Sequence, residues 1–237
     1  MSTRRDKRGY FFVYNGVSSK QFKIGIKTAP IRTIPERKVN TIEVPFRDGS
    51  LTLDTGTYGT FTIDFECLVV GSFTPQHIRK IKRWLSEPFG KLQVSDELEL
   101  EYEAKMISKV DFEELVENTG SFLITFECQP YAHYRQGLCL HTVSNNTEIH
   151  NETDTIALPY MKVYGSGNIT LTLNGEPITF KGVSEYIEVD SELMECFKDD
   201  NVLNDKMIGN FPIFKVGINT IVSNASKIDI LPRWRAL

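Results

Sequence analysis

Apolar and polar residues alternate at every second position over much of the chain, and this period predicts β-strands. In residues 61–67 the aromatic, Ile and Cys positions point one way, and Thr, Asp and Glu point the other. Residues 122–128 repeat the same F-x-I-x-F-E-C pattern. Such alternation is typical of antiparallel strands with one face on a core. We therefore expect these two strands to line a shared core, with the side chains of Cys67 and Cys128 inside it.

A third long amphipathic strand is predicted over residues 98–106. Its apolar positions alternate with four charged ones, which are Glu99, Glu101, Glu103 and Lys105. The solvent side of this strand is therefore strongly acidic. A row of charge like this is typical of a solvated sheet face, with a recognition surface as the alternative.

One helix is predicted between the strands. Thr74 suits the N-cap, and Pro75 suits the first helical position, where its missing N–H is no loss. One side of the helix is apolar, with Ile78, Ile81, Trp84 and Leu85. The other side is basic, with Arg79, Lys80, Lys82 and Arg83. Pro88 and Gly90 end the helix.

The composition of the chain changes at about residues 133–158. This segment is rich in Asn, Ser, Thr and Asp, and its apolar and polar residues show little sustained alternation. We expect a first domain over 1–135, a linker region over 136–158 with one strand at about 138–143, and a second domain over 159–237. Strand patterns in the second domain are short, and Asn174-Gly175 between two of them is a strong hairpin signal. Many short strands at regular spacing suggest a β-sandwich or jelly roll. The predicted fold is mainly β, with a β-sandwich-like first domain that contains one helix and a β-sandwich of the jelly-roll type as the second domain.

The composition and charge of the chain exclude some classes of function. The 237 residues are 41% hydrophobic and 24% charged, with 27 Lys+Arg against 31 Asp+Glu and a net charge of −4, which argues against a basic nucleic-acid-binding surface. No apolar run approaches the roughly 18 residues of a membrane span. The basic start is followed by an apolar run too short for a signal peptide, so we expect folding in a cytoplasm. The four cysteines lie far apart and are predicted to be free thiols: Cys67, Cys128, Cys139 and Cys196.

No catalytic, cofactor-binding or metal-binding residues are predicted. None of the four histidines has zinc-site spacing, and no nucleophile elbow, phosphate-binding loop or dinucleotide motif occurs. The acidic stretch 190–192 is better explained as turn chemistry than as a glycosidase carboxylate pair. Four aromatic residues of the second domain could form a sugar-stacking platform, or could equally be core or subunit contacts: Tyr160, Tyr164, Tyr186 and Trp234.

Several short motifs, in order along nearly the whole chain, resemble the siphophage distal tail protein (Dit) family. Those of the first half are residues 12–16 (FVYNG), 22–26 (FKIGI), 84–85 (WL), 92–102 and 126–131 (FECQPY). The family's "vpgRdG" turn is matched by residues 44–49 (VPFRDG), with Phe46 in place of the glycine. Those of the second half are residues 165–169 (GSGNI), 187–191 (IEVDS), 209–212 (GNFP) and 231–235 (LPRWR).

This resemblance implies a structural protein of the phage tail tip with no catalytic residues. Family members form a hexameric ring at the far end of the tail tube, through which DNA passes. The first domain builds the ring, and the second is a galectin-like or carbohydrate-module-like sandwich. The implied partners are further copies of the chain, the tail tube protein, the tape-measure protein, the tail-tip hub protein and sometimes receptor-binding proteins. The implied location is the virion tail tip, after assembly in the bacterial cytoplasm.

Two hypotheses about residues follow. The first is that Glu99, Glu101 and Glu103, or another acidic face of the first domain, border the lumen, since acidic walls repel DNA phosphates whereas basic walls would hold them. The second is that Arg47, Asp48 and Gly49 lie in a loop at the ring contact, because they match the family's turn.

Two other classes of function remain open. The runner-up is a carbohydrate-binding module that recognises host-surface glycans through the second sandwich, which sugar binding by residues 156–237 alone would favour. The third is an accessory domain of a secreted or cell-wall hydrolase, which the missing signal peptide disfavours.

Overall fold

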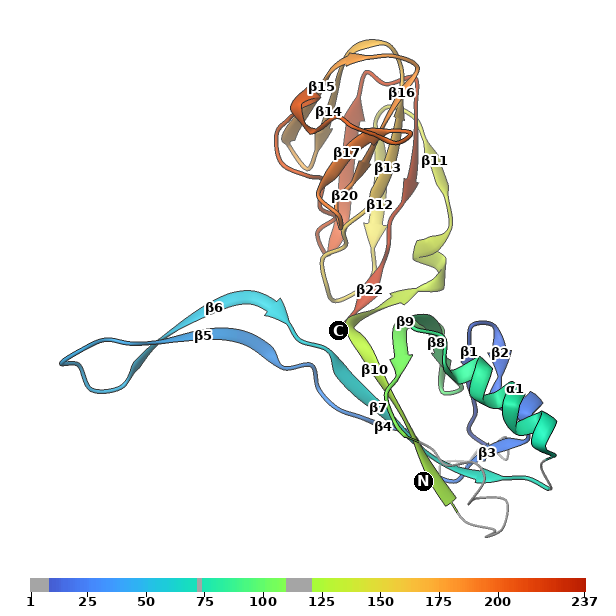
Figure 1. Ribbon diagram of the computed structural model, residues 1–237. Helices are drawn as coiled ribbons and strands as arrows, with labels where there is room; N and C mark the ends of the chain where they lie inside the picture. The colour runs from blue at the N-terminus through green and yellow to red at the C-terminus, as the bar shows by residue number, and fades with distance from the viewer. Residues whose placement is uncertain (1–8, 72–73, 110–120) are drawn as a thin grey trace, which may run out of the picture. The chain divides into compact units, whose positions relative to one another are not determined.

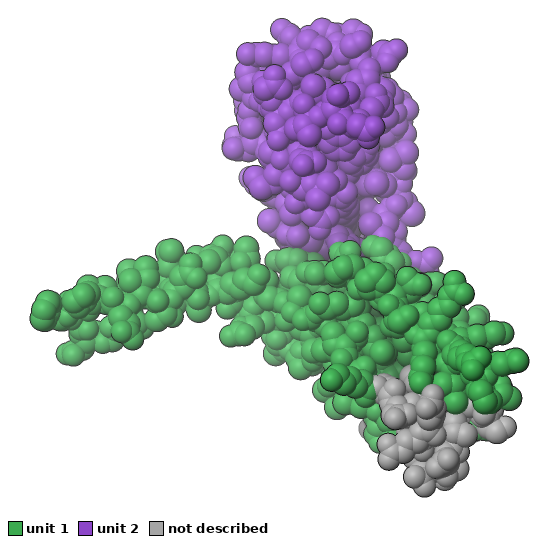
Figure 2. Space-filling model, in the orientation of Figure 1, with its two compact units in different colours: residues 1–132 green, residues 133–237 purple. Residues whose placement is uncertain are grey.

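The computed structural model describes residues 9–71, 74–109 and 121–237, and the chain in these ranges is mainly β. It forms two compact units, Met1–Ala132 and His133–Leu237, drawn in green and purple in Figure 2. Within the described ranges there is a single α-helix, as expected, and it lies in the first unit (Figure 1).

The first unit is built on one antiparallel sheet, called here the β10 sheet. Its strands follow the order β2 (Val17–Ser18), β1 (Phe12–Tyr14), β8 (Gly90–Val94), β9 (Glu97–Met106), β10 (Ser121–Tyr134), β7 (Phe61–Val69) and β3 (Ile24–Ile26), and β4 (Ile31–Arg32) also pairs with β7. The two strands with the repeated pattern, β7 and β10, are direct neighbours, with Cys67 opposite Phe122 and Ile63 opposite Phe126. Cys67 and Cys128 are fully buried. The predicted shared core is therefore confirmed.

Helix α1 (Pro75–Leu85) covers this core and begins where the sequence predicted. The Thr74 hydroxyl accepts a hydrogen bond from the His77 N–H at 3.3 Å, which caps the helix. The four predicted apolar positions are all buried: Ile78, Ile81, Trp84 and Leu85. The Trp84 indole N–H donates to the Tyr14 carbonyl at 2.8 Å, and its ring stacks on Phe22 at 4.5 Å between centroids. Phe22 ends the short 3-10 helix η1 (Ser19–Phe22).

Strands β5 (Arg37–Glu43) and β6 (Ser50–Tyr58) form a separate two-stranded sheet, which we call the arm, residues 37–58 (Figure 1). Each of these strands pairs only with the other in the described part of the chain. Every residue of β5 is exposed, and so is every residue of β6 except Tyr58. The arm thus contributes nothing to the core of its own unit.

The second unit is a β-sandwich, as predicted. One layer, the β13 sheet, has the order β11 (His141–Val143), β21 (Lys227–Leu231), β13 (Tyr160–Tyr164), β16 (Tyr186–Asp190), β17 (Glu195–Lys198) and β18 (Asn201–Val202). The other, the β14 sheet, has the order β12 (Thr147–Asn151), β20 (Gly217–Ser223), β14 (Gly167–Leu173), β15 (Glu176–Val183) and β19 (Met207–Ile208). Both sheets contribute side chains to one buried apolar cluster. Short elements complete the unit: η2 (Arg135–Leu138), η3 (Asn204–Lys206) and β22 (Arg235–Ala236).

The predicted hairpin lies between β14 and β15. Asn174 and Gly175 both have positive φ, 53° and 87°, as the tight two-residue turn requires. Leu173 pairs with Glu176 on either side of the turn, and Pro177 follows at the start of β15.

The segment expected as a linker, 136–158, is built into the second unit instead. Strand β11 pairs with β21, and β12 pairs with β20, so the segment supplies an edge strand to each layer. The boundary between the units falls after Ala132, three residues before the expected one. The strand expected at about residues 138–143 is present as β11, whereas β12 was not predicted, because a five-residue edge strand with one face in solvent carries little alternation.

The end of the chain returns to the start of this unit. The Tyr134 N–H donates to the Trp234 carbonyl and the Arg233 N–H donates to the Gly137 carbonyl, each at 2.8 Å. The carboxy-terminal residues therefore hold the segment that leads into the sandwich.

Candidate functional site

The arm has two chemically different faces. Ile42 lies opposite Leu51, and Asn40 lies opposite Leu53, so three large apolar side chains share one face. Each of the three is about half exposed, at 49%, 48% and 56%. The other face is largely polar and carries Thr41, Glu43, Ser50, Thr52 and Asp54 besides Val39. An isolated hairpin is marginally stable in water, and an uncovered apolar face marks an interaction site.

Contacts at the base of the arm hold its two strands together. The Arg37 guanidinium forms an ion pair with Asp54 at 2.6 Å and lies over the Tyr58 ring at 5.7 Å. The hydrogen bond from Arg37 holds the pKa of the Asp54 carboxyl below its ordinary value. At the root, the Gly59 N–H donates to the Glu36 carbonyl at 2.8 Å, which brings the two ends of the arm together.

The tip of the arm is the turn at residues 44–49, the segment singled out by the sequence. The Arg47 N–H donates to the Val44 carbonyl at 3.2 Å and closes the turn. Phe46 is the third residue of this turn and has a φ of 64°, in the left-handed region that favours glycine. Its side chain is fully exposed, at 110%. Arg47 and Asp48 are exposed beside it, and their side chains have no hydrogen-bond or ion-pair partner among the described residues.

The three glutamates of the predicted acidic row lie on one face of β9. Leu100, Tyr102 and Ala104, which alternate with them, are buried on the opposite face, and burial raises the pKa of Tyr102 to about 12. Glu101 accepts a hydrogen bond from the Gln93 amide at 3.2 Å and lies 3.6 Å from the Lys91 ammonium. Glu99 and Glu103 are exposed. The alternation was right from Leu100 to Ala104, but Leu98 is 41% exposed.

The four aromatic residues considered for sugar stacking do not form one platform. Tyr164 and Tyr186 are cross-strand neighbours on the outer face of the β13 sheet, with centroids 6.0 Å apart, and Tyr160 shares that face. Lysine ammonium groups already lie over the first two rings, with Lys162 Nζ 3.7 Å from the Tyr186 centroid and Lys227 Nζ 4.4 Å from the Tyr164 centroid. Trp234 instead belongs to the buried cluster between the layers.

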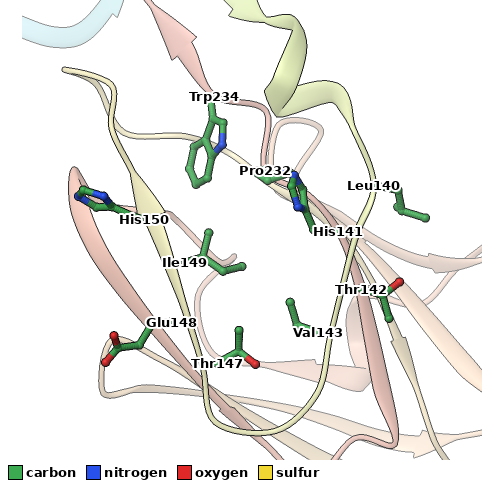
Figure 3. Close-up of a pocket in the computed structure, with 10 residues that line it drawn as sticks. All are labelled: Leu140, His141, Thr142, Val143, Thr147, Glu148, Ile149, His150, Pro232 and Trp234. Carbon is green, nitrogen blue, oxygen red and sulfur yellow. The ribbon is translucent and has the colours of Figure 1, made fainter.

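A cleft of about 470 Å³ opens in the second unit between the edge strands β11 and β12 (Figure 3). Val143 and Ile149 extend into it from the two walls, and Trp234 lies at one end. Glu148 and His150 also line it, but they alternate with Ile149 along β12 and their side chains point away from the cleft. The Glu148 carboxylate is exposed and has no side-chain partner in the described ranges. Sequence reasoning missed this cleft because its walls come from the segment expected as a linker.

All four cysteines are free thiols. Burial raises the pKa of Cys67 and Cys128 to about 12 and that of Cys196 to about 11. Cys139, next to the cleft residue Leu140, is exposed. Only this thiol is therefore open to reagents in solution.

The ranges that the structure describes contain neither a metal-binding cluster nor a membrane-spanning helix. No three His, Cys, Asp or Glu side chains come together as a metal site there. No helix there has the length and apolar character needed to cross a membrane.

The comparisons with known proteins agree with the resemblance. Residues 13–128 match the family model described as "Phage tail protein RIFT-related domain". Among solved structures, the Dit protein of phage SPP1 superposes with a TM-score of 0.68 at 11% sequence identity, covering 93% of this chain and 97% of that one. That protein is described as a paradigm of the hub adsorption apparatus in phages that infect Gram-positive bacteria. No curated protein sequence matches this chain.

Residues 13–128 of the first unit therefore form a phage tail RIFT-related domain. The fold of Dit extends over both units. The resemblance read from the short motifs is thus confirmed. The family belongs to the tail of the virion.

Proposed function

We propose that the chain is a tail-tip protein that forms a homohexameric ring between the tail tube and the tip hub. The observation that carries this proposal is the arm, which presents three apolar side chains on one face and an exposed turn at its end. The RIFT-related tail domain and the Dit fold support it. The role is structural rather than enzymatic, and assembly takes place in the host cytoplasm.

In this ring the arm contacts the neighbouring copy. A closed ring needs a head-to-tail interface, in which each copy offers two different surfaces. Burial of Ile42, Leu51 and Leu53 against a neighbour would remove their apolar area from water, which favours association. Arg47, Asp48 and Gly49 lie at the end of the same arm and so belong to the contact.

The acidic row of β9 borders the lumen in this proposal. Exposed carboxylates at Glu99 and Glu103 repel the phosphates of passing DNA, so the strand offers no surface to which DNA would adhere. The partners of the ring are the tail tube protein, the tape-measure protein and the tip hub protein, together with receptor-binding proteins in some tails.

The test is the mass of the purified full-length chain in solution. We expect a particle of six times the 27.0 kDa chain mass, measured by light scattering over a range of concentrations. Leu51→Glu should shift the population to single chains, because it places a charge on the apolar face. Thr52→Glu, on the opposite face of the same strand, is the matched control and should leave the mass unchanged. A wild-type chain that stays monomeric, or an equal effect of both variants, would contradict the proposal.

A further inference from the structure

We propose that Phe46 at the arm tip of one copy inserts into the cleft between β11 and β12 of the next copy. This inference rests on the proposed ring and names the two surfaces that meet in it. The tip belongs to the first unit and the cleft to the second, so the contact would join different parts of two identical chains.

The starting observation is that Phe46 breaks two local rules at once. It occupies the third position of a turn, with φ of 64°, where a bulky side chain is strained and glycine is not. Its ring is also exposed on all sides, at 110%. Neither the positive φ nor the exposed ring stabilises the single chain. Strained residues persist where function requires them, so an aromatic ring kept at this position indicates a binding anchor.

The cleft has the properties of a receptor for such an anchor. Its volume of about 470 Å³ can hold an aromatic side chain with part of the adjoining turn. Val143 and Ile149 form apolar walls, and the largely buried Trp234 lies at one end. The walls are edge strands, each paired on one side only within the described sheets, so the cleft stays open to an incoming turn.

Charge supports the same pairing. Arg47 follows Phe46 directly and has no side-chain partner in the described structure, and the same is true of Glu148, which precedes Ile149 and points to the outer side of β12. Seating Phe46 beside Ile149 would let the long Arg47 side chain reach over the edge of β12 to this carboxylate. A guanidinium and a carboxylate form strong, geometrically specific hydrogen bonds, which would fix the orientation of the inserted tip.

Symmetry links the pair to a ring rather than to a dimer. A projecting apolar side chain that fits a pocket elsewhere on the same molecule makes a head-to-tail contact. Such contacts repeat from copy to copy until the rotation closes. The tip and the cleft are thus two surfaces of the kind that a closed ring requires.

The first experiment exchanges the charges and measures the concentration at which half of the chains are assembled. Arg47→Glu and Glu148→Arg should each raise it about tenfold or more, and the double exchange should restore it. Glu195→Arg, at an exposed site on β17, is the matched control. If the losses of assembly in the two single variants simply add in the double variant, Arg47 and Glu148 do not pair and the proposal is wrong.

The second experiment tests proximity by cross-linking. Asp48→Cys, which leaves Phe46 in place at the arm tip, and Thr147→Cys, whose side chain points into the cleft, are combined in a Cys139→Ser background, where the remaining native thiols are all buried. Mild oxidation should then link chains into a ladder that ends at six, and neither single-cysteine variant should do so. If light scattering shows the sixfold particle but no ladder forms, this inference is wrong and the ring stands. If wild-type chains never assemble, the proposed function fails with it.

Discussion

Arg233 and Asp190 form a two-point ion pair in the second unit, with Nη1 2.7 Å from Oδ1 and Nη2 2.7 Å from Oδ2. The Asp190 side chain is only 6% exposed, and it also accepts hydrogen bonds from the N–H groups of Glu192 and Leu193. Burial alone would raise the pKa of this carboxyl, but the hydrogen bonds from Arg233 and the backbone outweigh it and keep the pKa below its ordinary value. The pair ties the carboxy-terminal segment to β16.

Replacing Arg233 should therefore destabilise the sandwich. Arg233→Met leaves the Asp190 carboxylate buried without its cation, and we expect a loss of about 3 kcal/mol at neutral pH. Because the folded-state pKa of Asp190 is depressed, its stabilisation is present above the ordinary value of 3.8 and is lost as the pH falls through the lower folded value. The difference between wild type and variant should accordingly shrink in acid.

Urea unfolding followed by Trp234 fluorescence measures this effect. A Trp84→Phe background leaves Trp234 as the sole tryptophan, because the chain has two. Lys181→Met, at an exposed position of β15, is the control and should change the stability by less than about 0.5 kcal/mol. An equal effect of the two substitutions, or a difference that grows in acid, would show that the pair does not stabilise the unit.

Gly137 should not tolerate even an alanine. A Cβ at this position would lie 2.4 Å from the Trp234 backbone nitrogen and 2.8 Å from its Cβ, so the backbone would have to move. We expect Gly137→Ala to cost about 1 to 3 kcal/mol, by the same urea measurement. Gln136→Ala, at the exposed neighbour, should cost far less. Equal midpoints for the two variants would contradict the close approach seen in the structure.

Phe46→Gly should affect the single chain and the assembly in opposite directions. Glycine relieves the strain of the positive φ, worth about 1 kcal/mol, so amide exchange in the arm of unassembled chains should slow about fivefold. Loss of the ring should at the same time raise the concentration needed for assembly. Asp48→Gly relieves no positive φ and should instead speed exchange. Faster exchange in Phe46→Gly would show that the turn is not strained.

Reversing the acidic row should slow DNA release. Virions that carry Glu99→Lys, Glu101→Lys and Glu103→Lys together would offer a basic surface to passing phosphates, and we expect slower release in a dye-accessibility assay. High salt should reduce the defect, since counterions screen phosphate contacts. The control carries Glu176→Lys and Glu195→Lys, at exposed positions of the second unit. If the triple variant releases DNA as fast as wild type at low salt, the proposed position of the acidic row at the lumen is wrong.

The strands and the helix that were predicted correctly are those in which the spacing of apolar residues matches one buried face. Strands β7 and β10 and helix α1 each place apolar residues at the spacing of one side, and all bury that side. The turn at Asn174-Gly175 was equally predictable, because its backbone geometry favours few other residues.

The sequence was least informative where neither face of a strand is buried in the chain itself. Strands β5 and β6 of the arm were not predicted, since Ile42 and Leu53 alternate around no core of their own unit. The sugar platform failed for a different reason: Tyr186 is already covered by two lysines, Lys162 and Lys198, which lie far from it along the chain. Predicting such contacts requires the register in which the strands pair, and a local sequence pattern does not contain that register.

The arm is an insertion between β4 and β7, which pair with each other, with Ile31 opposite Asp64. The hydrogen bond between Glu36 and Gly59 joins the two ends of the arm where it leaves these strands. The length of the arm can therefore change during evolution without disturbing the β10 sheet. Adding two residues to each strand would move the tip outward by about 7 Å and keep Ile42 and Leu51 on the same side. Adding one to each would turn the tip over relative to the root. Relatives with longer or shorter arms should thus differ from this chain by even numbers of residues per strand.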